Sequence, residues 1–230
     1  MPTALPTAAA ATMPRMTLLL ESAVAALALA VALALRPWRA VPAGGPPWPW
    51  LAWALLLPLC WGLDAYGGAP LAQPLSGACV LMLMAGWPLA VLLLLPVAAA
   101  TAMLADLGAA QALHRLVWLG LLPATLAMLL GAAVRRWLPR HLMVYILGRG
   151  FFATGLAGTA TAFALWAVHG PPPGLTAADW LLARGLTAWG DAFIAGMLAS
   201  IFVAFRPQWL ATYTDRLYLP GAEAPPPGRG

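Results

Sequence analysis

Residues 75–105, with the sequence LSGACVLMLMAGWPLAVLLLLPVAAATAMLA, contain no charged side chain. A helix needs about 20 apolar residues to cross a bilayer, so this stretch is too long for one straight crossing. Gly86, Trp87 and Pro88 lie near its middle. A glycine close to a proline favours the end of one helix and a turn into the next. The stretch therefore predicts two membrane-embedded helices, 75–86 and 88–105.

The rest of the chain has the same character. Hydrophobic residues make up 63% of the sequence and charged residues 8%, against about 25% charged in an average soluble domain. These charges are too few to cover a soluble globule, so we expect an all-α polytopic integral membrane protein. We expect a disordered N-terminal tail over 1–15, a transmembrane domain over 16–206 and a cytoplasmic C-terminal tail over 207–230. The other predicted helices are 17–35, 48–63, 116–134, 141–168 and 180–205.

The arginines predict the orientation. With seven helices, Arg36, Arg39, the cluster at 135–140 and the arginines after residue 205 lie on one side, whereas Arg15 and Arg115 lie on the other. With one helix over 75–105, the first two basic loops would face opposite sides. Because basic loops favour the cytoplasm, we expect seven helices with the N-terminus outside and the C-terminus in the cytoplasm.

Several functions are excluded by missing residues. The chain has no lysine, so it has no phosphate-binding loop and no Schiff-base chemistry. It also lacks the His-Glu-x-x-His motif of a membrane metalloprotease. Arginines scattered among apolar runs do not form a nucleic-acid surface. We therefore expect no enzyme, no catalytic residue, no cofactor and no nucleic-acid partner.

Ionisable side chains within the membrane are costly and so are candidates for function. Glu21, Arg149 and Asp191 are the predicted substrate-binding residues. From the cytoplasmic ends of their helices, Asp191 lies roughly 21 Å deep and Arg149 roughly 12 Å. An ion pair between these two is at the limit of arginine's reach. It would form either a structural clamp between the last two helices or the wall of a substrate cavity.

Small residues recur every four positions in these last two helices, which predicts close packing between them. The positions are Gly150, Thr154, Gly158 and Ala162 in one helix, and Ala188, Ala192, Gly196, Ser200 and Ala204 in the other.

The predicted outer side carries the candidate metal ligands. They are His114, His169, Asp64 and Asp106, because histidine and carboxylate side chains suit divalent transition metals. An acidic entrance would also concentrate cations. The alternative is that the bias of basic residues toward the cytoplasm leaves acids outside, without any metal.

Four stretches resemble the CbiM-like family, the substrate-capturing permease components of energy-coupling factor transporters for cobalt and nickel. The resemblance extends over about residues 39–219 and is closest to an uncharacterised proteobacterial branch. The stretches are LPRHLMVYIL (138–147) with Phe151 and Phe152, WGDAFIAGM (189–197), FRPQWLATY (205–213) with Asp215, Tyr218 and Leu219, and Ser76-Gly77 through Gly86-Trp87-Pro88-Leu89.

This resemblance implies uptake of a transition-metal ion, as substrate, across the bacterial inner (plasma) membrane. A separate transmembrane coupling subunit and ATPase subunits would supply the energy. The predicted surface for these partners, or for anionic lipid headgroups, consists of Arg135, Arg136, Arg140, Arg206 and Trp209.

The chain departs from the family's metal site. Relatives with known metal chemistry begin with Met-His, whereas this sequence begins Met1-Pro2-Thr3. The family's histidine before the third helix is replaced by Pro74-Leu75-Ser76-Gly77. Asp191 and Arg149 stand where relatives often carry Glu and Asn, which leaves an anionic or neutral ligand open. The alternative to a permease component is a membrane scaffold whose polar intramembrane residues only lock helices together.

Overall fold

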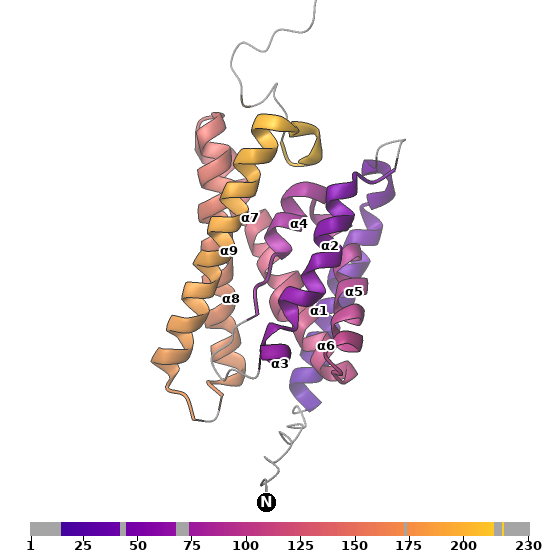
Figure 1. Cartoon of the computed structure of the whole chain (residues 1–230), viewed down its shortest axis with the longest axis vertical. Coiled ribbons are helices and arrows are strands. Elements are labelled where there is room, and N and C mark those ends of the chain that lie inside the picture. The colour runs from indigo at the N-terminus through magenta and orange to yellow at the C-terminus, as the bar shows by residue number, and fades with distance from the viewer. Residues whose placement is uncertain (1–14, 42–44, 68–73, 173, 214–217, 219–230) are drawn as a thin grey trace, which may run out of the picture.

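The computed structural model describes residues 15–41, 45–67, 74–172, 174–213 and 218, which form an all-α bundle (Figure 1). The helices are α1 (Arg15–Ala34), α2 (Trp48–Trp61), α3 (Leu63–Gly67), α4 (Ala78–Ala85), α5 (Trp87–Leu104), α6 (Ala109–Arg115), α7 (Leu122–Trp137), α8 (Ala153–His169) and α9 (Ala177–Phe205). Wider π-helical turns, Leu116–Leu121 and Val144–Phe152, continue directly into α7 and α8. The predicted tail over 1–15 lies almost entirely outside the described residues.

Five helices are long and apolar enough to cross a membrane, which supports a multi-pass membrane protein. They are Arg15–Ala34, Trp87–Leu104, Ala109–Trp137, Val144–His169 and Ala177–Phe205. Two of the seven predicted helices are shorter. Helix α2 has 14 residues and α4 has 8, so α4 extends only about 12 Å at the α-helical rise.

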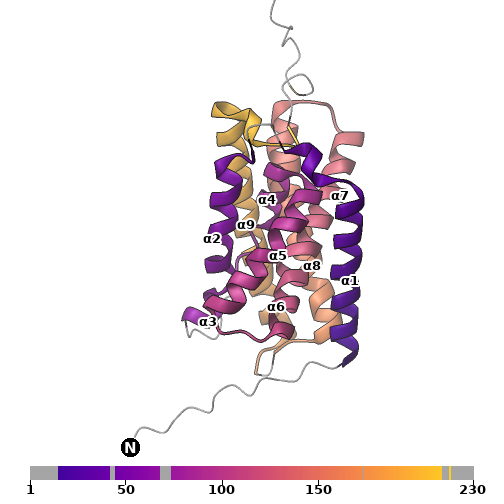
Figure 2. The same ribbon diagram turned by 90° about the vertical axis from the view of Figure 1, so that its right-hand side faces the viewer.

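The two ends of the bundle differ in charge. Figures 1 and 2 show that α1 begins and α9 ends at opposite ends, and that the loops after α1, α7 and α9 lie at the same end. We call this the basic end, because those loops and the last turn of α7 carry Arg36, Arg135, Arg136, Arg140 and Arg206. The other end holds His114 and the last residue of α8, His169, and we call it the histidine end.

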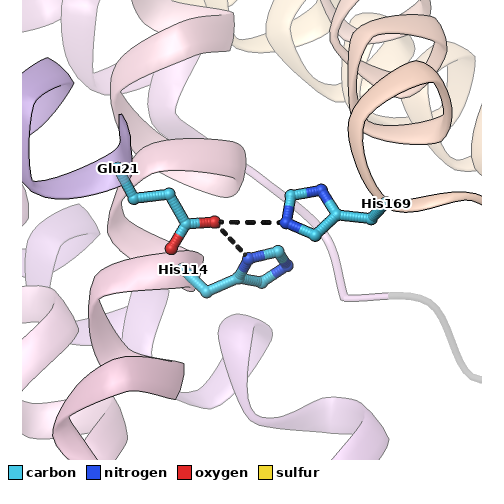
Figure 3. Close-up of side chains that lie close together, drawn as sticks. All are labelled: Glu21, His114 and His169. Carbon is cyan, nitrogen blue, oxygen red and sulfur yellow. Dashed lines mark hydrogen bonds and ion pairs between the residues drawn. The ribbon is translucent and has the colours of Figure 1, made fainter. Parts of the chain in front are cut away.

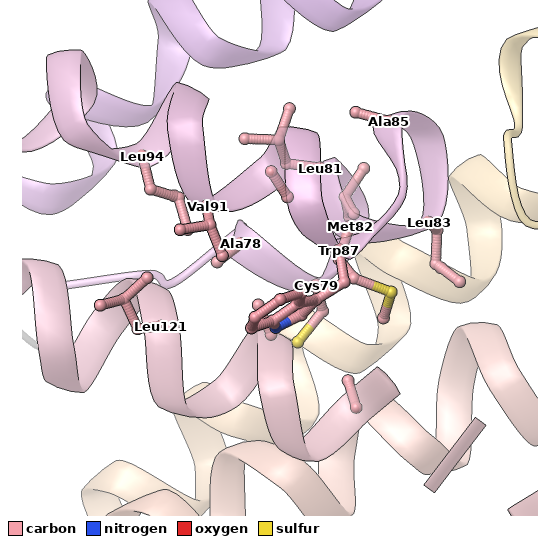
Figure 4. Close-up of a cluster of buried hydrophobic side chains, with 14 of the residues drawn as sticks. Ala78, Cys79, Leu81, Met82, Leu83, Ala85, Trp87, Val91, Leu94 and Leu121 are labelled. Atoms are coloured by element: carbon pink, nitrogen blue, oxygen red, sulfur yellow. The ribbon is translucent and has the colours of Figure 1, made fainter. Parts of the chain in front are cut away.

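Helix α4 lies at the centre of the core. All eight of its residues are buried, and Figure 4 shows several of them beside Trp87, Val91 and Leu94 of α5 and Leu121. A helix that is apolar on every side is expected where protein surrounds it completely. This position shields α4 from lipid, which allows non-helical backbone at its ends.

The predicted turn is confirmed at Gly86, whose φ of 79° lies in a region that favours glycine. The predicted start of the preceding helix is wrong, because α4 begins at Ala78 and not at residue 75. Pro74–Gly77 form no helix, and Gly77 has a φ of 59°. A Cβ atom on Gly77 would lie 2.5 Å from a methyl group of Leu57, so the approach to α4 leaves no room for a side chain there.

Close packing of α8 and the preceding π-helical turn against α9 is also confirmed. A Cβ atom on Gly150 would lie 3.3 Å from the backbone of Gly196, and one on Gly158 would lie 2.7 Å from the Cβ atom of Ala188. Small residues thus let these backbones approach, as the four-residue spacing predicts.

Substitution Gly158→Ala tests this contact. We expect a loss of about 1–3 kcal/mol of stability, because the added methyl group overpacks the helix interface. The matched control is Gly190→Ala on α9, where an added Cβ meets nothing within 4 Å. The control should be neutral or stabilising by up to about 1 kcal/mol. Melting curves of the purified variants in detergent make the comparison, and equal effects of the two changes would contradict this packing.

Candidate metal centre

Three side chains from distant parts of the sequence meet at the histidine end (Figure 3). Glu21 comes from α1, His114 from α6 and His169 from the end of α8. The Oε1 atom of Glu21 lies 2.7 Å from Nδ1 of His114 and 3.6 Å from Nε2 of His169. One ligand atom from each residue lies within 4.8 Å of the other two. We call these three residues the Glu–His–His cluster.

Glu21 is the buried polar anchor of α1. Its side chain is 1% exposed, although most of α1 is exposed and only Ala32 is also fully buried. The indole N–H of Trp118, on the Leu116–Leu121 π-helical turn, donates to Oε1 over 2.7 Å. A π-helical turn widens the helix and is often found at functional sites. Glu21 therefore fixes α1 to α6 and to this turn.

Some polar atoms of the cluster lack hydrogen-bond partners. Within the described part of the chain, Oε2 of Glu21 and both ring nitrogens of His169 are buried without one. A buried polar atom without a partner costs about 1–3 kcal/mol. The His169 ring is nevertheless held in place, with its centroid 5.1 Å from that of His114 and 5.4 Å from that of Trp118. The cluster thus presents oriented ligand atoms that the fold does not use.

The two distances from Glu21 suit a transition-metal ion. In a tetrahedral site with bonds of about 2.1 Å, ligand atoms lie roughly 3.4 Å apart. The two distances from Glu21 Oε1, 2.7 Å and 3.6 Å, lie on either side of that value. The proton between Glu21 and His114 must leave when a metal ion takes both atoms. Three protein ligands would leave one coordination position open for exchange.

The structure groups the predicted metal ligands differently from the sequence analysis. His114 and His169 come together with Glu21, which we predicted as a substrate ligand. Asp64 is held by Arg115, with N–O distances of 2.7 Å and 2.9 Å. Asp106 is exposed at the turn after α5, where its φ is 50°. Neither aspartate belongs to the Glu–His–His cluster.

Asp191 holds the backbone that leads into α4. Its Oδ2 atom accepts the backbone N–H of Ser76 over 2.8 Å, and it also interacts with the backbone of Gly77. Ser76 lies just before the helix, and its hydroxyl accepts the N–H of Ala78, the first residue of α4, over 3.3 Å. A carboxylate also stabilises the positive end of the helix dipole. Asp191 therefore has a structural role, although it also lines a cavity between α7, α8 and α9.

Arg149 lies on the other π-helical turn and contacts the C-terminal segment. Its guanidinium donates to the carbonyl of Thr212 over 3.2 Å and to the Tyr218 hydroxyl over 3.5 Å. Gly131 leaves room for it, since a Cβ atom there would lie 2.9 Å from Nε of Arg149. The predicted ion pair with Asp191 is not formed, because each side chain bonds to a different segment.

The predicted partner surface lies at the basic end. Arg135, Arg136 and Arg140 are exposed around the loop after α7. Arg206 is also exposed, and its guanidinium lies 6.0 Å from the Trp209 ring centroid. Trp209 itself packs on Trp48 and Phe202. The arginines thus remain accessible, whereas Trp209 mainly joins the C-terminal segment to the bundle.

Two further candidate functional residues, Trp118 and Arg184, were not predicted from the sequence. The sequence alone does not distinguish Trp118 from the other tryptophans of the chain. Arg184 lies in the last span, seven positions before Asp191 and on the same helix face. As a basic residue within a predicted membrane helix, Arg184 carried the same signal as Arg149.

No family model, curated protein or solved structure matches the chain. The geometry of the site is therefore the basis for its function.

Asp191→Ala tests this hydrogen bond. We expect a loss of about 1–3 kcal/mol, because the part-buried N–H of Ser76 loses its acceptor. Asp191→Asn is the matched variant, since its amide oxygen can still accept from Ser76, and it should retain most of the stability. Thermal unfolding of both variants measures the difference. An alanine variant as stable as the asparagine variant would refute this structural role.

Proposed function

We propose that this protein binds a divalent transition-metal ion at the Glu–His–His cluster and is the substrate-capturing permease component of an uptake system. The metal ion is the substrate and not a resident cofactor. The observation that carries the proposal is the convergence of one carboxylate and two imidazoles whose ligand atoms lie within 4.8 Å. Two of these residues, Glu21 and His169, also have buried atoms that no described group satisfies.

The exposure of the ligands suits capture followed by release. The side chains of His114 and His169 are 25% and 20% exposed, whereas Glu21 is almost fully enclosed. An ion can therefore reach the edges of the imidazole rings before the carboxylate, and it meets the buried nitrogens of His169 below the surface. Because Glu21 is on the sparsely packed α1, ion binding would draw α1 against α6 and α8. Release would require only that this helix loosen.

The charge distribution supports an orientation for uptake. The basic end is assigned to the cytoplasm, because basic loops favour that side. The histidine end then faces the outside of a bacterial inner membrane, where it can meet the incoming ion. The accessible arginines at 135, 136 and 140 would meet a coupling subunit or anionic lipid. ATPase subunits would supply the energy, in keeping with the resemblance to energy-coupling factor permeases and with the absence of lysine.

A membrane scaffold is the second candidate, and one observation favours it. Asp191 and Arg149, the deepest predicted functional groups, are both bonded to backbone in the folded chain. Their roles can thus be wholly structural. The scaffold hypothesis gives no use for the unsatisfied atoms of Glu21 and His169, and for this reason we place it second.

A thermal-shift panel with cobalt, nickel, zinc and manganese ions tests metal binding. At a hundredfold excess over Kd, a bound ion should stabilise the protein by about 2.7 kcal/mol. His169→Phe should abolish the shift. This variant keeps a ring in contact with His114 and Trp118, and His169 makes no hydrogen bond that folding would miss.

The matched control is His141→Phe. His141 is exposed in the loop after α7, at the basic end and not at the histidine end, so its loss should leave the metal-induced shift unchanged. Flat melting curves of the wild-type protein with all four ions would refute metal capture and leave the scaffold as the better hypothesis. A shift that persists in His169→Phe but disappears in His141→Phe would place the metal at the basic end, and would refute binding at the Glu–His–His cluster.

A further inference from the structure

Arg184 is a cation in a membrane-embedded helix, and none of the described residues forms an ion pair with it. Its Nε atom is buried without a hydrogen-bond partner in the described part of the chain. The guanidinium carbon of Arg184 lies 5.5 Å from the centroid of the Trp180 ring. The ion pairs of the described residues join Glu21 to the two histidines and Asp64 to Arg115, so none includes Arg184.

The acids around Arg184 are already engaged. The carboxylate whose charge acts on Arg184 is that of Asp64, and both of its oxygens accept from Arg115. Asp191 lies two helical turns along α9, and its carboxylate accepts the backbone N–H of Ser76. An unpaired cation is costly inside a membrane protein and marks a functional site by default. Arg184 is therefore charged, mostly enclosed and available to an external partner.

A cavity lies beside this guanidinium. Arg184 and Asp191 line it, together with Trp118, Thr161, Thr187 and Ser76. The volume that the centres of water molecules can occupy in this cavity is about 40 Å³. A single water needs roughly 10–15 Å³ by this measure, so the cavity has room for about three. A large ligand does not fit this space, whereas a halide or a short carboxylate does.

We propose that this cavity binds a small monovalent anion, such as chloride or formate, against the guanidinium of Arg184. The anion supplies the missing counter-charge. Guanidinium donors bind such groups through charge-assisted hydrogen bonds, and carboxylates in particular suit its planar fork. The hydroxyls of Thr161 and Thr187 already donate to the carbonyls of Ala157 and Ala183, so Arg184 is the donor that defines the site.

The anion also has a consequence for the Glu–His–His cluster, and this step rests on the proposed function. Trp118 belongs both to the cavity wall and to the hydrogen bonds of Glu21. The charge of Arg184 reaches the ring of His114. An uncompensated guanidinium would therefore repel an arriving divalent ion, and an anion beside it would reduce that repulsion.

The test uses the full-length protein in detergent without any metal, so its outcome does not depend on metal binding. Chloride, formate or acetate is titrated against gluconate at constant ionic strength while Tm is measured. We expect a saturable rise of about 5 °C at a hundredfold excess over Kd with the small anions. Gluconate is too large for the cavity and should have no such effect. The best-fitting ion shows whether a halide or a carboxylate is preferred.

Arg184→Met removes the charge and keeps an apolar side chain against Trp180. In gluconate this variant should be at least as stable as the wild type, and the small anions should no longer raise its Tm. Arg206→Gln is the control, because Arg206 also lies over a tryptophan ring but at the basic end. Its anion response should match the wild type.

Each of three results would count against the anion site. One is a wild-type Tm that does not distinguish the small anions from gluconate. Another is an Arg184→Met variant with the same anion response as the wild type. A variant that is less stable than the wild type in gluconate would also count against it, because Arg184 would then be satisfied by the fold alone.

Discussion

The hydrogen bond from the Ser76 backbone to the Asp191 carboxylate is the interaction on which the rest of this structure depends. It satisfies a backbone N–H of the non-helical segment that leads into α4 inside the bundle. The helix then begins at Ala78, whose N–H donates to the Ser76 hydroxyl. Because Asp191 belongs to α9 and Ser76 precedes α4, the bond also fixes one half of the bundle to the other.

The opposite end of α4 is satisfied in a similar way by a distant segment. The backbone N–H of Ala211 donates to the carbonyl of Met84 over 2.8 Å, and the Thr212 hydroxyl donates to that of Leu83 over 2.9 Å. Arg149 and Tyr145 in turn hold Thr212. The segment after α9, predicted only as a tail, thus closes the core at the C-terminal end of α4. Two of the three intramembrane charges predicted as substrate ligands, Arg149 and Asp191, thus bond to the backbone segments that adjoin the two ends of α4.

The other charged groups within the predicted membrane helices, Glu21 and Arg184, lie toward the histidine end. The Glu–His–His cluster contains buried ligand atoms without hydrogen-bond partners among the described residues, and Arg184 is in none of their ion pairs. One favours a cation and the other an anion, and Trp118 lies between them. This division separates the polar groups that build the bundle, around α4, from those available to ligands at one of its ends.

Much of the fold could be predicted from local sequence. Apolar length and the Gly86–Pro88 turn predict the helices, and four-residue spacing predicts the α8–α9 contact, because these features depend on neighbours along one chain segment. The non-helical segment before α4 could not be predicted in this way, since the acceptor of its Ser76 N–H is Asp191, more than a hundred residues away.

The sequence by itself determined that this is a membrane protein of packed apolar helices with one basic end, because hydrophobicity and arginine placement are properties of each segment alone. Only the tertiary structure decided which polar groups meet. Glu21 joins His114 and His169, Asp64 joins Arg115, and Arg149 and Asp191 remain apart. Such pairings depend on the rotation and depth of helices relative to one another, and those are fixed by packing of the whole bundle.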